Sequence, residues 1–248
     1  MSNSTGAQHT SFAGQTVLIL GASSGIGLSV AQQARAAGAN VIMTARDPDR
    51  LSAAASSIGA AATAAFDITD HEALSGFFED LTDPIDHVFV SGSGPYYAPL
   101  GEIDLASARD GLATPIVLMI DLAQLAPPHM RPGGSLIFMG GTGARRPAPG
   151  LSVIGPLVAA ASAAVANLAL EIAPARINLV AAGFVDSPLS ARILGPDLDA
   201  RREDLAARLP IHRVVQPDDV ASLVLYVMSN TALTGSVYDI DGGQQLLG

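Results

Sequence analysis

Two residue types that often carry enzyme chemistry are absent from this sequence. Its 248 residues include no cysteine and no lysine, because all thirteen basic residues are arginines. The lack of cysteine excludes disulfides, a thiolate nucleophile and cysteine-ligated metal sites. The lack of lysine excludes Schiff-base chemistry and any mechanism that depends on a lysine ammonium group.

Charge is also scarce, and what there is has mainly one sign. Charged residues make up 15% of the chain and hydrophobic residues 49%, a balance typical of one large, well-covered core rather than of a disordered chain. The formal net charge is −10, with no basic stripe, so we expect no nucleic acid partner. The five histidines lack the spacing of metal ligands, so no metal site is predicted.

The sequence predicts neither a targeting segment nor a membrane span. Its first fourteen residues lack the basic and apolar regions of a signal peptide. The most apolar segment, Leu157–Ala173, is interrupted by polar residues and is too weak and too short for a bilayer span. We therefore expect a cytoplasmic protein that does not bind membranes.

Short apolar runs alternate with longer helical patterns along the chain. Such alternation predicts an α/β fold, a doubly wound (Rossmann) parallel sheet of about seven strands with helices on both faces. We expect a single domain over residues 14–248 after a flexible tail over residues 1–13. The expected strands are Thr16–Leu20, Asn40–Thr44, Ala61–Phe66, Asp86–Val90, Ser135–Met139, Ile177–Val180 and Val237–Ile240. The expected helices are Ile26–Ala37, Asp47–Ile58, His71–Leu81, Leu105–Leu125, Pro156–Ala173 and Pro217–Ser229.

A polar insertion over residues 187–209 follows the sixth expected strand. An insertion there lies above the carboxyl ends of the strands, where doubly wound sheets bind their ligands. We interpret it as a substrate lid; the alternative is an ordinary pair of surface helices.

The first expected strand runs directly into a glycine-rich turn and then a helix. Glycines allow a tight turn and close approach, and the free amides of the helix N-terminus attract the pyrophosphate of a dinucleotide. The alternative is a glycine turn kept only for packing between helix and sheet. The predicted cofactor contacts in this turn are Gly21, Ser23, Ser24, Gly25, Ile26 and Gly27.

The end of the second expected strand bears on the choice of cofactor. An NAD site places a carboxylate there for the ribose hydroxyls, whereas a 2′-phosphate favours a guanidinium. This chain has Ala45 at the acidic position and Arg46 next, which favours NADP(H) over NAD(H), with Arg50 a weaker second candidate. The alternative is that Arg46 is only a solvated surface charge.

The spacing Gly-x-x-x-Gly-x-Gly resembles that of the short-chain dehydrogenase/reductase family, and the similarity extends over nearly the whole chain. It includes Phe66-Asp67-Ile68-Thr69-Asp70, Leu168-Ala-Leu-Glu-Ile-Ala-Pro174, Gly183-Phe184-Val185-Asp186-Ser187-Pro188 and Asp241-Gly242-Gly243. The resemblance implies adenine contacts from Asp67 and Ile68. It also implies cofactor contacts from Ser91 and Gly92, where the family has Asn-Asn-Ala-Gly, and from Gly183, Val185 and Ser187 beside the nicotinamide.

The resemblance fails at the catalytic residues. In the family a lysine ammonium stabilises the phenolate of a tyrosine four residues earlier, which makes that tyrosine a useful acid and base. When the chain is aligned with the family pattern at its Leu168–Pro174 segment, without a gap, Gly155 stands at the tyrosine position, Ala159 at the lysine position and Thr142 at the serine position. Pro156 fits only the first helical turn, so the helix is expected to start near Gly155 or Pro156, or else at Ser152.

Three residues are candidates to act instead. Thr142 could donate a hydrogen bond to a substrate oxygen; the alternative is that it satisfies the backbone at the strand end. Tyr96 and Tyr97 follow the fourth expected strand and could reach the cleft; the alternative is a packing role.

The sequence therefore predicts an NADP(H)-binding oxidoreductase with an atypical active site. It would transfer hydride to or from a small organic substrate, a carbonyl, an imine or a conjugated acceptor. The alternative is a catalytically inactive NADP(H)-binding pseudoenzyme that acts as a sensor or as a partner subunit.

A homo-oligomer, either a dimer or a tetramer, is also expected. The two long helices Leu105–Leu125 and Pro156–Ala173 resemble those that form the family's interfaces. Small residues permit close helix packing, and the alternative is that this face is buried within its own sheet. The face in question comprises Ala160, Ala161, Ala164 and Leu168.

Overall fold

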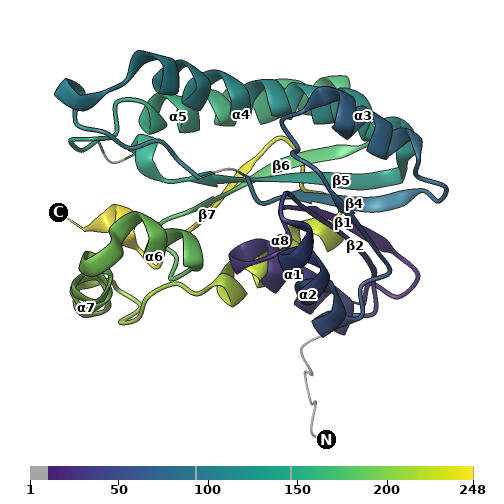
Figure 1. The fold of residues 1–248 in the computed structure, drawn as a ribbon, viewed down its shortest axis with the longest axis horizontal. Helices are drawn as coiled ribbons and strands as arrows, with labels where there is room; N and C mark the ends of the chain where they lie inside the picture. Colours follow the sequence, from purple (N-terminus) through teal and green to yellow (C-terminus); the bar gives the residue numbers. More distant parts are fainter. Residues whose placement is uncertain (1–10, 93, 146, 248) are drawn as a thin grey trace, which may run out of the picture.

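A computed structural model describes residues 11–92, 94–145 and 147–247 of the chain. It contains a seven-stranded sheet with the order β3-β2-β1-β4-β5-β6-β7, in which all neighbouring strands are parallel (Figure 1). This confirms the doubly wound α/β fold. The strands are β1 (Thr16–Leu20), β2 (Asn40–Ala45), β3 (Ala62–Ala65), β4 (Ile85–Val90), β5 (Met130–Gly141), β6 (Arg176–Ala182) and β7 (Val237–Ile240).

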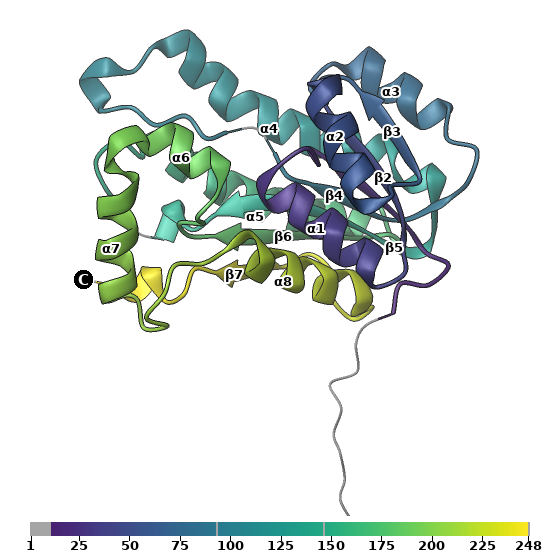
Figure 2. The same ribbon diagram turned by 60° about the horizontal axis from the view of Figure 1, so that its bottom comes forward.

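Helices cover both faces of the sheet. In Figure 1, α3, α4 and α5 lie above the sheet, and α1, α2 and α8 lie below it. Helices α6 and α7 form the insertion after β6 and lie together at one end of the molecule (Figure 2). The helices are α1 (Gly25–Ala36), α2 (Pro48–Ile58), α3 (His71–Glu79), α4 (Leu105–Leu125), α5 (Ile154–Glu171), α6 (Pro188–Leu194), α7 (Leu198–Arg208) and α8 (Pro217–Ser229).

The central strands are apolar because both of their faces are covered. Successive side chains of β1 point to opposite faces, so Val17 and Ile19 join one core and Leu18 and Leu20 join the other. All four side chains are fully buried. The sheet therefore gives a rigid base on which the loops at its carboxyl edge are held.

Local capping explains several helix starts. The carboxylate of Asp47 accepts a hydrogen bond from the Arg50 amide at the start of α2, and Pro48 follows at the first helical position. Asp70 caps α3 and Asp104 caps α4 in the same way. These three carboxylates are committed to helix ends.

The structure moves some predicted boundaries. β5 and β6 are longer than predicted, since pairing in the sheet extends beyond their apolar centres. α5 begins at Ile154, between the two starts that the sequence left open, so that Pro156 lies within the first turn. The insertion over residues 187–209 is the helix pair α6 and α7.

The packed part of the chain begins before the predicted boundary at residue 14. Residues 1–10 of the expected tail lie outside the described residues. Phe12, however, is fully buried, and its ring meets the ring of His87 edge to face at a centroid distance of 5.6 Å. The amide of Phe12 also donates a hydrogen bond to the Ala37 carbonyl, so this residue belongs to the domain.

Candidate active site

The turn between β1 and α1 requires its glycines. Gly21 and Gly25 have φ values of 92° and 56°, a conformation that other residues rarely adopt. Gly27 is in ordinary helix, but a Cβ atom there would lie 2.0 Å from the Gly21 carbonyl oxygen. Any side chain at Gly27 would therefore push the turn away from the helix.

The N-terminus of α1 is open toward a ligand. Ser24 is the N-cap residue, yet its side chain makes no capping hydrogen bond, and the first turn contains no acidic residue. The amides of this turn and the helix dipole therefore favour an anion. The glycine turn and this open helix end fit the pyrophosphate of a dinucleotide.

Loops from three strands meet around this turn. A Cβ atom on Gly21 would lie 3.1 Å from the Cβ of Ser91, which follows β4. A Cβ atom on Gly25 would lie 3.6 Å from Pro188 and 3.9 Å from Ser187, which follow β6. The structure thus brings together Gly21, Gly25, Ser91 and Ser187, residues that the sequence assigned to one cofactor site.

Other predicted cofactor residues have their side chains engaged elsewhere. Val185 is buried in the core, and its backbone pairs with that of Val215 in an isolated bridge, so its side chain packs on the core. The hydroxyl of Ser187 caps α6 by accepting a hydrogen bond from the Ser190 amide. A Cβ atom on Gly183 would meet the Cβ of Asp241 at 2.7 Å, so this glycine is needed for close packing.

The remaining predicted cofactor contacts differ in their surroundings. Ser23 in the turn and Ile26 in the first turn of α1 are both half-buried. Ile26 also packs on the hydrophobic core. Gly92 has a φ of 79° and open space where a Cβ would be. Ile68 packs against the core on the other face of the sheet.

Arg46 and Asp67 lie at the ends of neighbouring strands β2 and β3. The Arg46 guanidinium is 74% exposed and lies 4.0 Å from Asp67 Oδ2. Asp67 Oδ1 accepts hydrogen bonds from the Thr69 backbone amide and from the Thr69 hydroxyl. These bonds lower the pKa of Asp67, and the hydrogen bond from the backbone amide contributes most. Asp47, the acid next to Arg46, is used as the cap of α2. Arg46 is therefore an exposed cation at the end of β2, with the carboxylate of Asp67 beside it.

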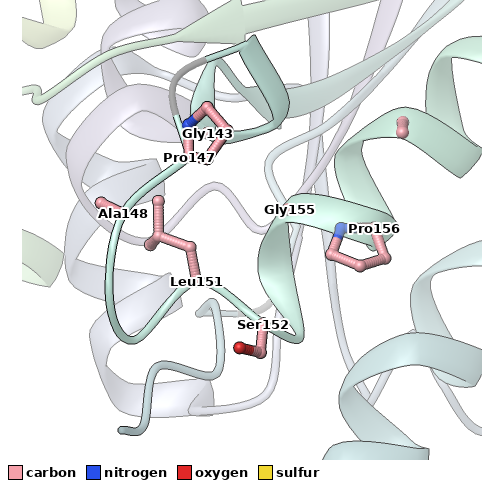
Figure 3. A pocket seen from close by; sticks show the side chains of 8 residues that line it. Gly143, Pro147, Ala148, Leu151, Ser152, Gly155 and Pro156 are labelled. Atoms are coloured by element: carbon pink, nitrogen blue, oxygen red, sulfur yellow. The ribbon is translucent and has the colours of Figure 1, made fainter. Parts of the chain in front are cut away.

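The start of α5 holds no acid or base at the two places where the family resemblance puts them. Gly155 and Ala159 line an open recess of about 400 Å³ (Figure 3). A Cβ atom on Gly155 would find nothing within 4 Å. We call this cavity the α5 recess; it is lined by Gly143, Pro147, Ala148, Leu151, Ser152, Gly155, Pro156 and Ala159.

The three candidate replacements differ in their surroundings. The Tyr96 hydroxyl accepts a hydrogen bond from the Asp104 amide at 3.0 Å, which favours the packing alternative for this residue. Tyr97 is 48% exposed, and burial of its ring raises its pKa, the opposite of what a neighbouring ammonium would do. Thr142 is 9% exposed beside Gly143 and does not line the α5 recess.

The insertion of α6 and α7 is held to the loops after β6 and β4 by charge and by close contact. Arg202 of α7 donates hydrogen bonds to both carboxylate oxygens of Asp186, at 2.7–3.1 Å, and also pairs with Asp199. A Cβ atom on Gly94, after β4, would lie 3.2 Å from Leu189 of α6. The sequence did not predict the Asp186 to Arg202 pair, because the partners lie on different elements.

Comparison with known proteins decides the family. A family model described as enoyl-(acyl carrier protein) reductase matches residues 21–245. The chain belongs to the short-chain dehydrogenase/reductase family. It is 29% identical over 248 residues to the short-chain dehydrogenase/reductase ATR9 of Stachybotrys chlorohalonatus, covering 93% of this chain and 96% of that protein.

Solved structures of similar proteins share the fold. The MalC reductase/Diels-Alderase of Malbranchea aurantiaca superposes with a TM-score of 0.88 at 24% identity, over 97% of this chain and all of that one. BdcA, solved in complex with NADPH, superposes with a TM-score of 0.82 at 26% identity, over 94% of this chain and 95% of that one. The predicted resemblance to the family is thus confirmed.

Proposed function

We propose that this member of the family is an NADP(H)-dependent oxidoreductase that transfers hydride between the nicotinamide and a small organic substrate. The observation that carries the proposal is the glycine turn with the open end of α1, together with the exposed Arg46 at the end of β2. When bound, the cofactor supplies or accepts the hydride. The chain's own residues bind it, orient it and shape the substrate space.

The preference for NADP(H) over NAD(H) rests on the charge at the end of β2. A guanidinium forms strong, charge-assisted hydrogen bonds with a phosphate group, whereas NAD recognition needs a free carboxylate at this place. Asp47 is engaged as a helix cap, and Asp67 is engaged by Thr69. The NADPH complex of the similar protein BdcA supports the same cofactor.

The active site in this proposal is atypical for the family. The chain has no lysine, and Gly155 and Ala159 offer no group that could move a proton. Positioned acid and base catalysis is typically worth about 10²–10⁴-fold, so simple ketones should react slowly here. Iminium ions, which form when imines are protonated in water, and conjugated acceptors suit the site better because they accept hydride with less help from an acid. The family model that matches is named for enoyl reductases, which supports this substrate class.

The absence of the tyrosine and the lysine also favours a second function. A pseudoenzyme that binds NADP(H) as a sensor or partner subunit would need neither the tyrosine nor the lysine. The two proposals separate in one assay, in which purified protein and NADPH meet a panel of carbonyl, imine and enone compounds. We expect NADPH absorbance to fall with at least one imine or enone. NADPH binding without any turnover across the panel would favour the pseudoenzyme.

We also propose that the protein is a cytoplasmic homo-oligomer. Two helical segments, Leu105–His129 and Ile154–Glu171, are long and apolar enough to cross a membrane, but each packs one side on the sheet. Their outer sides expose apolar groups such as Val117 and Ile120 of α4. A second copy of the chain would cover these sides. Light scattering in solution should give the mass of a dimer or a tetramer, and a stable monomer would contradict this proposal.

A further inference from the structure

The α5 recess has a chemical character of its own. Two segments enclose it, the loop before α5 with Pro147, Ala148 and Leu151, and the first turns of the helix itself (Figure 3). Its volume of about 400 Å³ falls within the range of sites that hold small organic molecules. Gly155 and Ala159 lie four residues apart on one side of the helix, so the recess extends along α5 where longer side chains would fill it.

The described residues that line the α5 recess carry no charge. They are glycine, proline, alanine and leucine, with Ser152 as the sole side chain able to form a hydrogen bond. A charged group entering this space would lose water without gaining a partner, which is costly. An apolar group would gain free energy from leaving water. The described part of the lining therefore favours neutral, mainly apolar molecules.

Ser152 lines the recess and lies two residues before α5 begins at Ile154. Its side chain is exposed. A hydroxyl in an otherwise apolar lining can donate to or accept from one polar atom of a ligand and so fix its orientation.

We propose that the α5 recess binds the neutral, ring-sized apolar part of the substrate, with Ser152 as a positioning residue for its polar atom. This inference rests on the proposed oxidoreductase function and names the substrate class of that same site. The small residues at positions 155 and 159 are then a specificity device, because they leave room in the recess for ring-shaped substrates.

The test uses two probes with one carbon skeleton, neutral 2-acetylnaphthalene and anionic 6-acetyl-2-naphthoate. Binding to the full chain, with NADPH present, is followed by ligand-observed nuclear magnetic resonance. The neutral probe should bind at least about tenfold more tightly than the anionic one. Equal binding, or tighter binding of the anionic probe, would overturn the proposal.

Two alanine-to-leucine variants locate the binding site. Ala159→Leu fills the recess and should weaken binding of 2-acetylnaphthalene at least about tenfold, because the added side chain takes the ligand's place. Ala163→Leu, one turn further along α5 and outside the recess, should change the affinity by less than about twofold. If both variants bind equally well, the ligand binds elsewhere.

A milder variant separates positioning from structure. Ser152→Ala should weaken binding of 2-acetylnaphthalene by about 2- to 10-fold, the worth of one neutral hydrogen bond, and should leave 2-ethylnaphthalene unchanged. Ser152→Thr should restore binding of the ketone. Equal losses for both probes would show a structural role only.

The readout is binding, so the two proposals can fail separately. Binding of the neutral probe in the recess without NADPH binding would remove the proposed function alone. NADPH turnover that is insensitive to Ala159→Leu would remove the recess alone.

Discussion

At the amino ends of the central strands, buried polar side chains are paired with one another, whereas at the carboxyl ends glycines and exposed groups take their place. His87 in β4 bonds to Ser135 Oγ at 2.8 Å and to Gln15 Oε1 at 3.0 Å. Asp86 accepts a hydrogen bond from the Thr16 amide at 2.7 Å and pairs with Arg131.

Arg176 is the strongest example at the amino end. Its guanidinium, on the first residue of β6, donates hydrogen bonds to the carbonyls of Val227, Met228, Asn230 and Leu233 at 2.6–3.1 Å. These carbonyls belong to the last turn of α8 and the loop after it, so one buried cation caps the helix end.

The carboxyl ends leave polar capacity unused. Among the described residues, Thr44 Oγ1 is the buried side-chain polar atom without a hydrogen-bond partner, and it lies near the end of β2 beneath the glycine turn. Ser24 does not cap α1, and Arg46 faces solvent. The comparison teaches that paired polar groups stabilise the fold at one edge of the sheet, whereas the other edge keeps polar groups that the fold does not use.

The largest effect is expected from removing the cation at the amino edge. Arg176→Met leaves several buried carbonyls without a hydrogen-bond donor. It should therefore lower the free energy of unfolding by about 3–5 kcal/mol, measured by urea denaturation. NADPH affinity of the folded fraction should not change. Arg213→Met, which breaks an exposed pair with Asp219, is the matched control and should cost less than about 1 kcal/mol. Similar losses in both variants would contradict the special role of this edge.

Acid should also act on the amino edge. Burial lowers the pKa of His87 to about 4 from 6.5, so between these values the unfolded chain binds a proton that the folded chain excludes. Stability is unaffected by this group above pH 6.5 and should fall by about 3 kcal/mol as the pH drops toward 4. His87→Gln should remove this slope. An unchanged slope in that variant would assign the acid sensitivity to other groups.

At the carboxyl edge, single side chains should matter less for rate. Tyr97→Phe and Thr142→Ala are each expected to lower turnover by less than about 10²-fold, because substrate positioning and hydride geometry carry most of the rate. A loss above about 10³-fold with unchanged NADPH affinity would identify a dedicated proton donor or oxyanion partner.

The smallest expected effect concerns ketone reduction, for which we expect no gain in rate. Gly155→Tyr combined with Ala159→Lys supplies the family's two missing side chains, yet we expect no ordinary ketone reduction, because Pro156 lies in the first turn of α5 and alters its start. Steady-state kinetics with a simple ketone would test this. A clear gain in rate would show that only the side chains were absent.

Much of the fold could be predicted from the sequence, since alternating apolar runs and helical patterns leave few arrangements of a parallel sheet. The glycine-rich turn between β1 and α1 was also predictable, because Gly21, Gly25 and Gly27 stand in a motif with a physical purpose. The length of β5 was not, since Pro132 and Gly133 look like a turn; β5 pairs with β4 at Met130, and the register then shifts before Ser135 pairs with His87.

The α5 recess could not be predicted in the same way. Glycine, alanine and proline carry no chemical signal in a sequence, and the space between them exists only once the loop folds back on α5. The pair of Asp186 and Arg202 was missed for a related reason, since neither residue belongs to a motif that names its partner.

The most direct test of the account is a titration of NADPH and NADH into the wild-type chain, Arg46→Ala and Arg50→Ala, followed by calorimetry. The wild-type chain should bind NADPH more tightly. Arg46→Ala should lose about 1.5–3 kcal/mol of NADPH affinity, the usual worth of hydrogen bonds to a charged group, and should leave NADH nearly unchanged. Arg50→Ala should have the weaker effect. Equal or tighter binding of NADH by the wild-type chain would contradict the account.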